Sequence, residues 1–181
     1  MRCMIFGVGH DSGRSQGEMM KGVVCAMQLI NLRQRPAAIE LIAPWHYAEW
    51  GALFPGRSLA DFAAELALSL APAAVPQTWL VQNAAGEIVG TGSLLLQDMA
   101  TNQQLSPWLA NIYLVPEVRG QGLGRALVQQ LMQQAAQLQI QTLYLFTEDQ
   151  QAFYQRLGWQ LHHTELYEGH WVSVMQWQPD C

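Results

Sequence analysis

The chain contains, between an apolar run and an amphipathic stretch, the segment Val115-Pro116-Glu117-Val118-Arg119-Gly120-Gln121-Gly122-Leu123-Gly124-Arg125. The apolar run, residues 108–115, predicts a strand, which Pro116 ends because proline has no amide hydrogen for a ladder. In residues 122–138 apolar side chains recur at helical spacing opposite a glutamine-rich face, which predicts a helix. Alternating glycines at a helix N-terminus let unpaired amides approach an anion. The segment therefore predicts a phosphate-binding turn between a strand and a helix.

Two common phosphate loops differ from this one. An ATP- or GTP-binding loop needs a lysine after its last glycine, and the only lysine of the chain is Lys21. A dinucleotide fingerprint needs glycine where Leu127 stands, although Glu148 and Asp149 imitate its ribose-binding carboxylate. A nucleotide-binding oxidoreductase therefore stays open as an alternative, and predicts that the chain binds NAD in place of coenzyme A.

The remaining pattern predicts an α/β (α+β) architecture. A strand around Ile30 precedes a helical stretch that we expect Pro44 to kink or split, because proline lacks the amide hydrogen of a helix interior. Ser58 is the predicted N-cap of the next helix. Further strands are predicted at residues 78–82, 87–96 and 142–147, a short helix at 151–157, and an antiparallel pair at 159–164 and 171–178. We expect a mixed, mostly antiparallel sheet of six to seven strands around a parallel strand-helix-strand unit.

Two motifs in this order resemble the GNAT superfamily of N-acetyltransferases. Arg119-x-x-Gly122-x-Gly124 matches the coenzyme-A signature of that family, and Phe153-Tyr154-Gln155-Arg156-Leu157-Gly158-Trp159 matches its second motif. The resemblance covers roughly residues 28–178. It implies the GNAT fold, acetyl-CoA as co-substrate and no metal.

The resemblance also implies roles for individual residues. The pantetheine arm would pair with the strand at Tyr113, Leu114 and Val115, and one of these amides would polarise the thioester carbonyl. Tyr154 falls on the tyrosine that assists the leaving thiolate. The remaining residues implied in coenzyme-A binding are those of the loop, namely Arg119, Gly120, Gln121, Gly122, Leu123, Gly124 and Arg125.

The general base and the acceptor pocket are less determined. Relatives often carry an acidic base on the strand before the loop, where this chain has Asn111 and Tyr113. Deprotonation could instead run through water to Asp98 or His46; the alternatives are a strand-end turn residue and a core histidine. For the acceptor we expect contacts from Trp45, Trp50 and Asn111, although aromatic residues at helical spacing are usually core.

Composition narrows the partners. The net charge is −5 at pH 7, which disfavours nucleic acid and favours a cationic partner such as a small-molecule or peptide amine. No apolar run reaches a membrane-spanning length, and the cysteine usage suits the cytoplasm. We expect a monomer or homodimer, with residues 1–26 as a loosely ordered extension and residues 27–181 as the catalytic domain. The leading hypothesis is an acetyl-CoA-dependent N-acetyltransferase; the alternative is an inactive coenzyme-A-binding sensor or interaction module.

Overall fold

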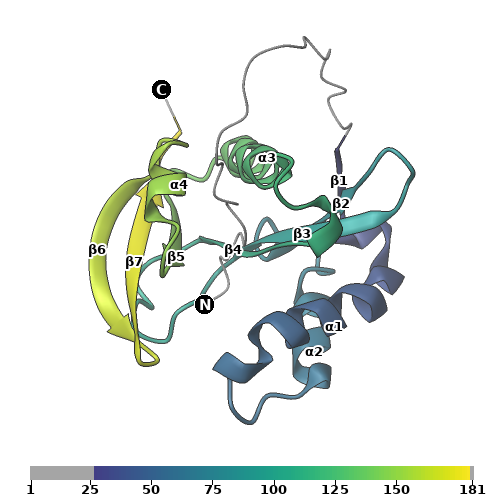
Figure 1. Cartoon of the computed structure of the whole chain (residues 1–181), viewed down its shortest axis with the longest axis horizontal. Helices are drawn as coiled ribbons and strands as arrows, with labels where there is room; N and C mark the ends of the chain where they lie inside the picture. Colours follow the sequence, from purple (N-terminus) through teal and green to yellow (C-terminus); the bar gives the residue numbers. More distant parts are fainter. Residues whose placement is uncertain (1–26, 180–181) are drawn as a thin grey trace, which may run out of the picture.

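A computed structural model describes residues 27–179, in which one seven-stranded sheet carries helices on both faces (Figure 1). The residues of the predicted extension, 1–26, lie outside this range. The strand order is β1-β2-β3-β4-β5-β7-β6, antiparallel throughout except for the neighbours β4 and β5. The predicted mixed sheet around one parallel pair is thereby confirmed. The strands are β1 (Gln28–Asn31), β2 (Gln77–Gln82), β3 (Ile88–Leu95), β4 (Trp108–Leu114), β5 (Leu143–Thr147), β6 (Gln160–Tyr167) and β7 (His170–Trp177).

The helices divide between the two faces of the sheet. Helices α1 (Ile39–Trp50) and α2 (Leu59–Leu68) cover the face called here the α1 face, whereas α3 (Leu123–Gln137) and α4 (Gln151–Gln155) cover the opposite α3 face (Figure 1). Short 3-10 turns occupy Leu32–Gln34, Pro36–Ala38, Gly51–Leu53 and Pro116–Val118. Because successive strand residues point to opposite faces, each strand supplies side chains to both layers.

The main core lies between the sheet and α3. Leu127, Val128 and Leu131 of α3 are completely buried against Leu109 and Ile112 of β4. Gly92 of β3 faces this helix, and a side chain at that position would collide with Leu131. Because α3 packs closely against the sheet, its N-terminus lies at the carboxyl end of β4. The segment that leads into α3 and includes its first residues, 119–125, is called here the glycine loop.

The first helix, α1, is not split at Pro44, although a split there was one of the two expected outcomes. Pro44 cannot donate to the carbonyl of Glu40, but both residues lie on the exposed side of the helix, where water can satisfy that carbonyl. The predicted cap of α2 is confirmed: the Ser58 side chain accepts from the Asp61 amide while the Asp61 carboxylate accepts from the Ser58 amide.

The final hairpin is longer than the prediction, since β6 continues to Tyr167 and β7 begins at His170. Strand β7 pairs with β5, so β6 forms the edge of the sheet. Among the helices of residues 27–179, none has the length and apolar composition that a bilayer crossing requires.

Candidate active site

The parallel strands β4 and β5 pair near the start of β4 and then separate. Within residues 27–179, their only register partners are Trp108 and Tyr144, and the Tyr144 amide donates to the Pro107 carbonyl at 3.0 Å. Beyond this point β5 pairs with β7 on its other edge, and β4 pairs with β3. The edge of β4 that faces β5 therefore offers backbone amides and carbonyls to a ligand instead of to a neighbouring strand.

A bulge in β4 accompanies this separation. Asn111 has a φ of 55°, which non-glycine residues rarely adopt, and the register with β3 shifts there. Two hydroxyls of β3 hold it: Thr91 Oγ1 donates to the Asn111 carbonyl at 3.1 Å, and Asn111 Nδ2 donates to Ser93 Oγ at 3.1 Å. Further buried hydroxyls continue the chain, from Ser93 to Thr78 and from Thr78 to Ser69, each over 2.9 Å.

His46 joins the same network from α1. Its Nε2 lies 2.8 Å from Thr91 Oγ1, and the ring is buried edge-on against Trp50. The Thr91 hydroxyl has a single hydrogen, which it gives to the Asn111 carbonyl, so it must accept from His46. The network thus assigns a hydrogen to Nε2, and His46 supports the bulge of β4 through Thr91.

The glycine loop contains two residues in the left-handed region of the backbone. Gly120 and Gly122 have φ values of 75° and 80°, in the left-handed region that glycine adopts without strain. Gly122 is the N-cap of α3, and the first helical bond is donated by the Ala126 amide to the Gly122 carbonyl at 3.2 Å. The amides of residues 122–125 therefore precede the hydrogen-bonded helix, at the positive end of its dipole.

The Arg119 side chain turns back from the loop to the end of β4. Its Nε donates to the Leu114 carbonyl at 2.7 Å, and its guanidinium lies 5.4 Å from the ring centroid of Tyr113 and 4.0 Å from Glu49. The Trp45 ring stacks on the Tyr113 ring, with 5.6 Å between the two centroids. These contacts tie the loop to α1 and place two of the predicted residues, Trp45 and Tyr113, side by side on the α1 face.

The phenol of Tyr113 is poorly suited to accept a proton. Burial raises its pKa above the ordinary 10.0, and the Arg119 guanidinium only partly opposes this effect. The group is therefore protonated at neutral pH, where it can form hydrogen bonds but does not act as a base.

The remaining predicted residues lie in different places. Tyr154 is completely buried in the core of the α3 face, with its ring 5.9 Å from Trp159. Trp50 is completely buried, with its ring centroid 6.3 Å from that of Tyr113. Asp98 follows β3, and Leu95 near the end of β3 pairs with Trp108 at the start of β4. Asp98 therefore lies at the closed end of the separation, where β4 and β5 still pair. The structure groups Trp45, His46, Asn111 and Tyr113, but not Asp98, at the bulge.

Three residues near the separated strands were not among the predicted site residues, namely Thr91, Ser93 and Glu148. Thr91 and Ser93 lie in the predicted strand 87–96 and alternate with glycines. This pattern indicates a polar, closely packed strand face but does not predict a functional role for either residue. In the sequence, Glu148 stood out only as part of the pair with Asp149 that imitates a ribose-binding carboxylate. Its proximity to His170, 2.9 Å from Oε1 to Nδ1, arises from the pairing of β5 with β7.

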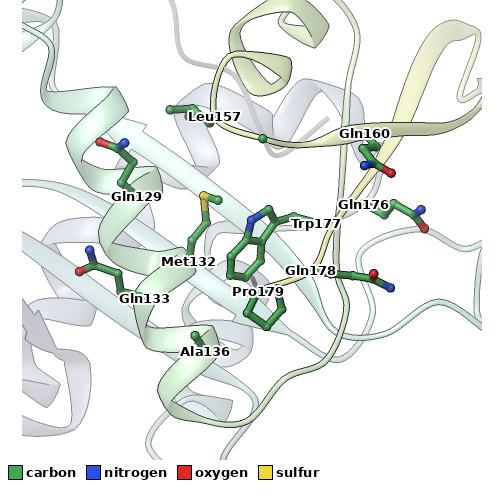
Figure 2. Close-up of a pocket in the computed structure, with 11 residues that line it drawn as sticks. Gln129, Met132, Gln133, Ala136, Leu157, Gln160, Gln176, Trp177, Gln178 and Pro179 are labelled. Carbon is green, nitrogen blue, oxygen red and sulfur yellow. The ribbon is translucent and has the colours of Figure 1, made fainter. Parts of the chain in front are cut away.

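A cavity of about 720 Å³ lies elsewhere on the α3 face, and Figure 2 draws the residues that line it. Its walls are the middle of α3, from Gln129 to Ala136, and the ends of β6 and β7, including Trp177. The cavity begins nearly two helical turns after Gly122 and no charged side chain lines it, so it does not fit a pyrophosphate. The cavity is therefore not part of the candidate site.

Comparisons with known proteins agree with this geometry. Residues 76–161 match the family model described as acetyltransferase (GNAT) domain. No curated protein sequence matches the chain.

Solved structures resemble the chain at low sequence identity. The spermidine N-acetyltransferase from Vibrio cholerae in complex with CoA and spermine has a TM-score of 0.64 at 16% identity, over 84% of this chain and 95% of its own. A proposed acetyltransferase from Acinetobacter baylyi has a TM-score of 0.66 at 15% identity, over 87% and 96%. At such identities the likeness establishes a shared fold.

Proposed function

This chain belongs to the GNAT acetyltransferase family, and we propose that it transfers the acetyl group of acetyl-CoA to a primary amine of a small-molecule or peptide acceptor by direct attack. The observation that carries the proposal is the separation of β4 from β5 directly before a glycine loop at a helix N-terminus. Together they offer an unpaired strand edge for amides and a positive backbone end for phosphates.

Coenzyme A would lie along both features. The pyrophosphate accepts hydrogen bonds from amides of residues 120–125, where Gly120 and Gly122 leave room for oxygen atoms close to the backbone. The pantetheine amides pair with the β4 edge at Tyr113 and Leu114. We no longer expect a contribution from Val115, because its amide donates to the Val89 carbonyl and its carbonyl accepts from the Val118 amide. The hydrogen bond from Arg119 to the Leu114 carbonyl fixes the angle between strand and loop.

The thioester then reaches the level of the bulge. An amide of Tyr113 or Leu114 donates to its carbonyl oxygen, and this bond strengthens as negative charge develops on that oxygen. Tyr154 donates a hydrogen bond to the departing thiolate. Because a free phenol has a pKa about 1.5 units above that of a thiol, complete transfer of its proton would cost roughly 2 kcal/mol, and a hydrogen bond is the cheaper form of assistance.

A cationic acceptor fits the chain best. The net charge is −5, and the solved neighbour that contains spermine is an amine acetyltransferase. The walls of the acceptor site are Trp45 and Tyr113 of the α1 face, with Asn111 behind them. The absence of a metal and of a nucleic-acid partner, a cytoplasmic location, and a monomeric or dimeric state all stay predictions.

The second candidate function is a coenzyme-A-binding module without catalysis. It is favoured by the residues of β4 at the bulge, Asn111 and Tyr113, neither of which is a carboxylate. Acetyl-CoA turnover with a panel of primary amines, followed by detection of the released thiol, separates the two. Binding of CoA in calorimetry without thiol release from any amine would favour the module.

A further inference from the structure

Glu148 lies across the separation from the bulge of β4. Trp108 of β4 pairs with Tyr144 of β5. Glu148 comes as many residues after Tyr144 as Ile112 comes after Trp108, so Glu148, directly after β5, lies at the level of Ile112 on β4. Its side chain lies on the α1 face, since it lines a cleft with Phe146 and with Leu53, which follows α1. Glu148 thus occupies the same face as Tyr113, on the opposite strand.

The cleft at Glu148 is small and largely apolar. Its cavity measures about 10 Å³, which is the space of one water molecule or one ammonium group. Phe54, Phe146 and Tyr167 form aromatic walls, and aromatic faces attract cations. The Glu148 Oε1 atom is buried there without a hydrogen bond of good geometry from residues 27–179. A carboxylate in such a position gains most from a cation that enters the cleft.

His170 is the titratable neighbour of this carboxylate. Its Nδ1 lies 2.9 Å from Glu148 Oε1, close enough for an ion pair although not aligned as a hydrogen bond, and half of its side chain is exposed. The other ionisable groups around the cleft are Glu168 and Tyr167 of the same hairpin. Behind Phe54, the Arg57 guanidinium is held by Glu65 at 2.6 Å.

From this arrangement we infer that Glu148 is the group that receives the acceptor ammonium and takes its proton, with His170 as the relay to solvent. The inference rests on the proposed function, and it supplies the base that β4 lacks. It favours Glu148 over Asp98, which lies at the closed end of the separation, and over His46, whose Nε2 supports Thr91.

The acceptor enters as R–NH₃⁺, and one N–H proton passes to the Glu148 carboxylate and on to His170 and water. The neutral amine then forms a C–N bond with the thioester carbon, the C–S bond breaks, and the second proton lost from nitrogen ends on the coenzyme-A thiol. A primary alkylamine, with a pKa near 10, needs this help at neutral pH, whereas a weakly basic amine is already neutral there.

The test compares two acceptor classes in Glu148→Gln, His170→Gln and the control Glu87→Gln, which changes an exposed glutamate in the turn between β2 and β3. Glu148→Gln keeps the size of the side chain but cannot take a proton. We expect kcat/KM for a primary alkylamine to fall about 10²- to 10³-fold at neutral pH, and for a hydroxylamine-type acceptor to change less than about threefold. His170→Gln should show a smaller loss of the same kind, and Glu87→Gln none. Affinity for CoA should stay unchanged in all three.

Two further measurements keep the result decisive. The alkylamine activity of Glu148→Gln should rise about tenfold per pH unit towards the pKa of the amine, because bulk solvent then supplies the neutral form. Binding of the alkylammonium ion, measured by calorimetry without acetyl-CoA, should weaken in Glu148→Gln. Equal losses with both acceptor classes, or none with either, would overturn the role of Glu148. Absence of thiol release in the parent protein would instead refute the proposed function, while the ammonium titration would still test the binding site.

Discussion

The Thr91 hydroxyl on β3 donates a 3.1 Å hydrogen bond to the carbonyl of Asn111, at the residue where β4 bulges. Replacing Thr91 with Val keeps its shape but removes this bond and the acceptor of His46. We expect a loss of about 1–3 kcal/mol in the free energy of unfolding, because buried polar groups lose their partners. If the bulge positions the oxyanion-binding amide, kcat should fall roughly tenfold while CoA affinity stays the same. Steady-state kinetics and CoA calorimetry check both values.

The matched control is Thr91→Ser, which retains the hydroxyl. It should restore kcat to near that of the parent while remaining somewhat less stable, since it lacks the methyl group. A Thr91→Val protein with the parent kcat would show that the bulge holds its geometry without this bond.

The glycine loop permits a test that separates ligand contact from backbone strain. Gly122 and Gly56 both have positive φ, 80° and 90°, and a Cβ at either position meets nothing within 4 Å in the free protein. Alanine at either site should therefore cost a similar 1–2 kcal/mol of stability, approximately the penalty for the left-handed region. If CoA phosphates approach the Gly122 backbone, only Gly122→Ala should bind CoA weakly, by about tenfold or more.

Thermal melts and CoA calorimetry on the two variants check this expectation. Equal CoA affinity in both variants, at equal stability, would remove the phosphate from the glycine loop and with it the main support for the proposed function.

Much of the fold follows from local patterns in the sequence. The period of residues 122–138 and the glycines before them predict α3 and its position after a strand, because helix face and loop chemistry are local properties. The continuity of α1 through Pro44 was not predictable in this way. It depends on Glu40 and Pro44 both facing solvent, which only the packing of α1 against the sheet decides.

The candidate site is less accessible from sequence because its contacts join distant strands. Thr91 meets Asn111 only through the register of β3 with β4, and Glu148 meets His170 only through the pairing of β5 with β7. Motif resemblance implies the coenzyme-A loop, whose glycines lie close together in the chain. The resemblance cannot imply Glu148 as the base, because relatives often carry theirs on the strand before the loop and Glu148 follows β5.

The Tyr113 phenol gives a prediction for alkaline pH. Burial raises its pKa, so we expect its tyrosinate absorbance, taken as the difference between the parent and Tyr113→Phe, to appear above pH 10. A raised pKa in the folded state stabilises the protein below the unfolded value of about 10, and this contribution is lost as pH rises through the folded value. The melting temperature of the parent should therefore fall more steeply above pH 10 than that of Tyr113→Phe. Parallel falls in the two proteins would contradict the shift.

Tyr154 tests whether a completely buried phenol assists the leaving group. Tyr154→Phe preserves the ring that packs against Phe153 and Trp159, so the fold and the CoA affinity should persist. The hydroxyl matters most as charge develops on sulfur, so its removal should lower kcat by about one to three orders of magnitude with little change in KM. An acyl donor whose thiol is more acidic should recover part of this loss, because its thiolate needs less stabilisation. A kcat within about twofold of the parent, or no recovery with the more acidic thiol, would assign Tyr154 to packing alone.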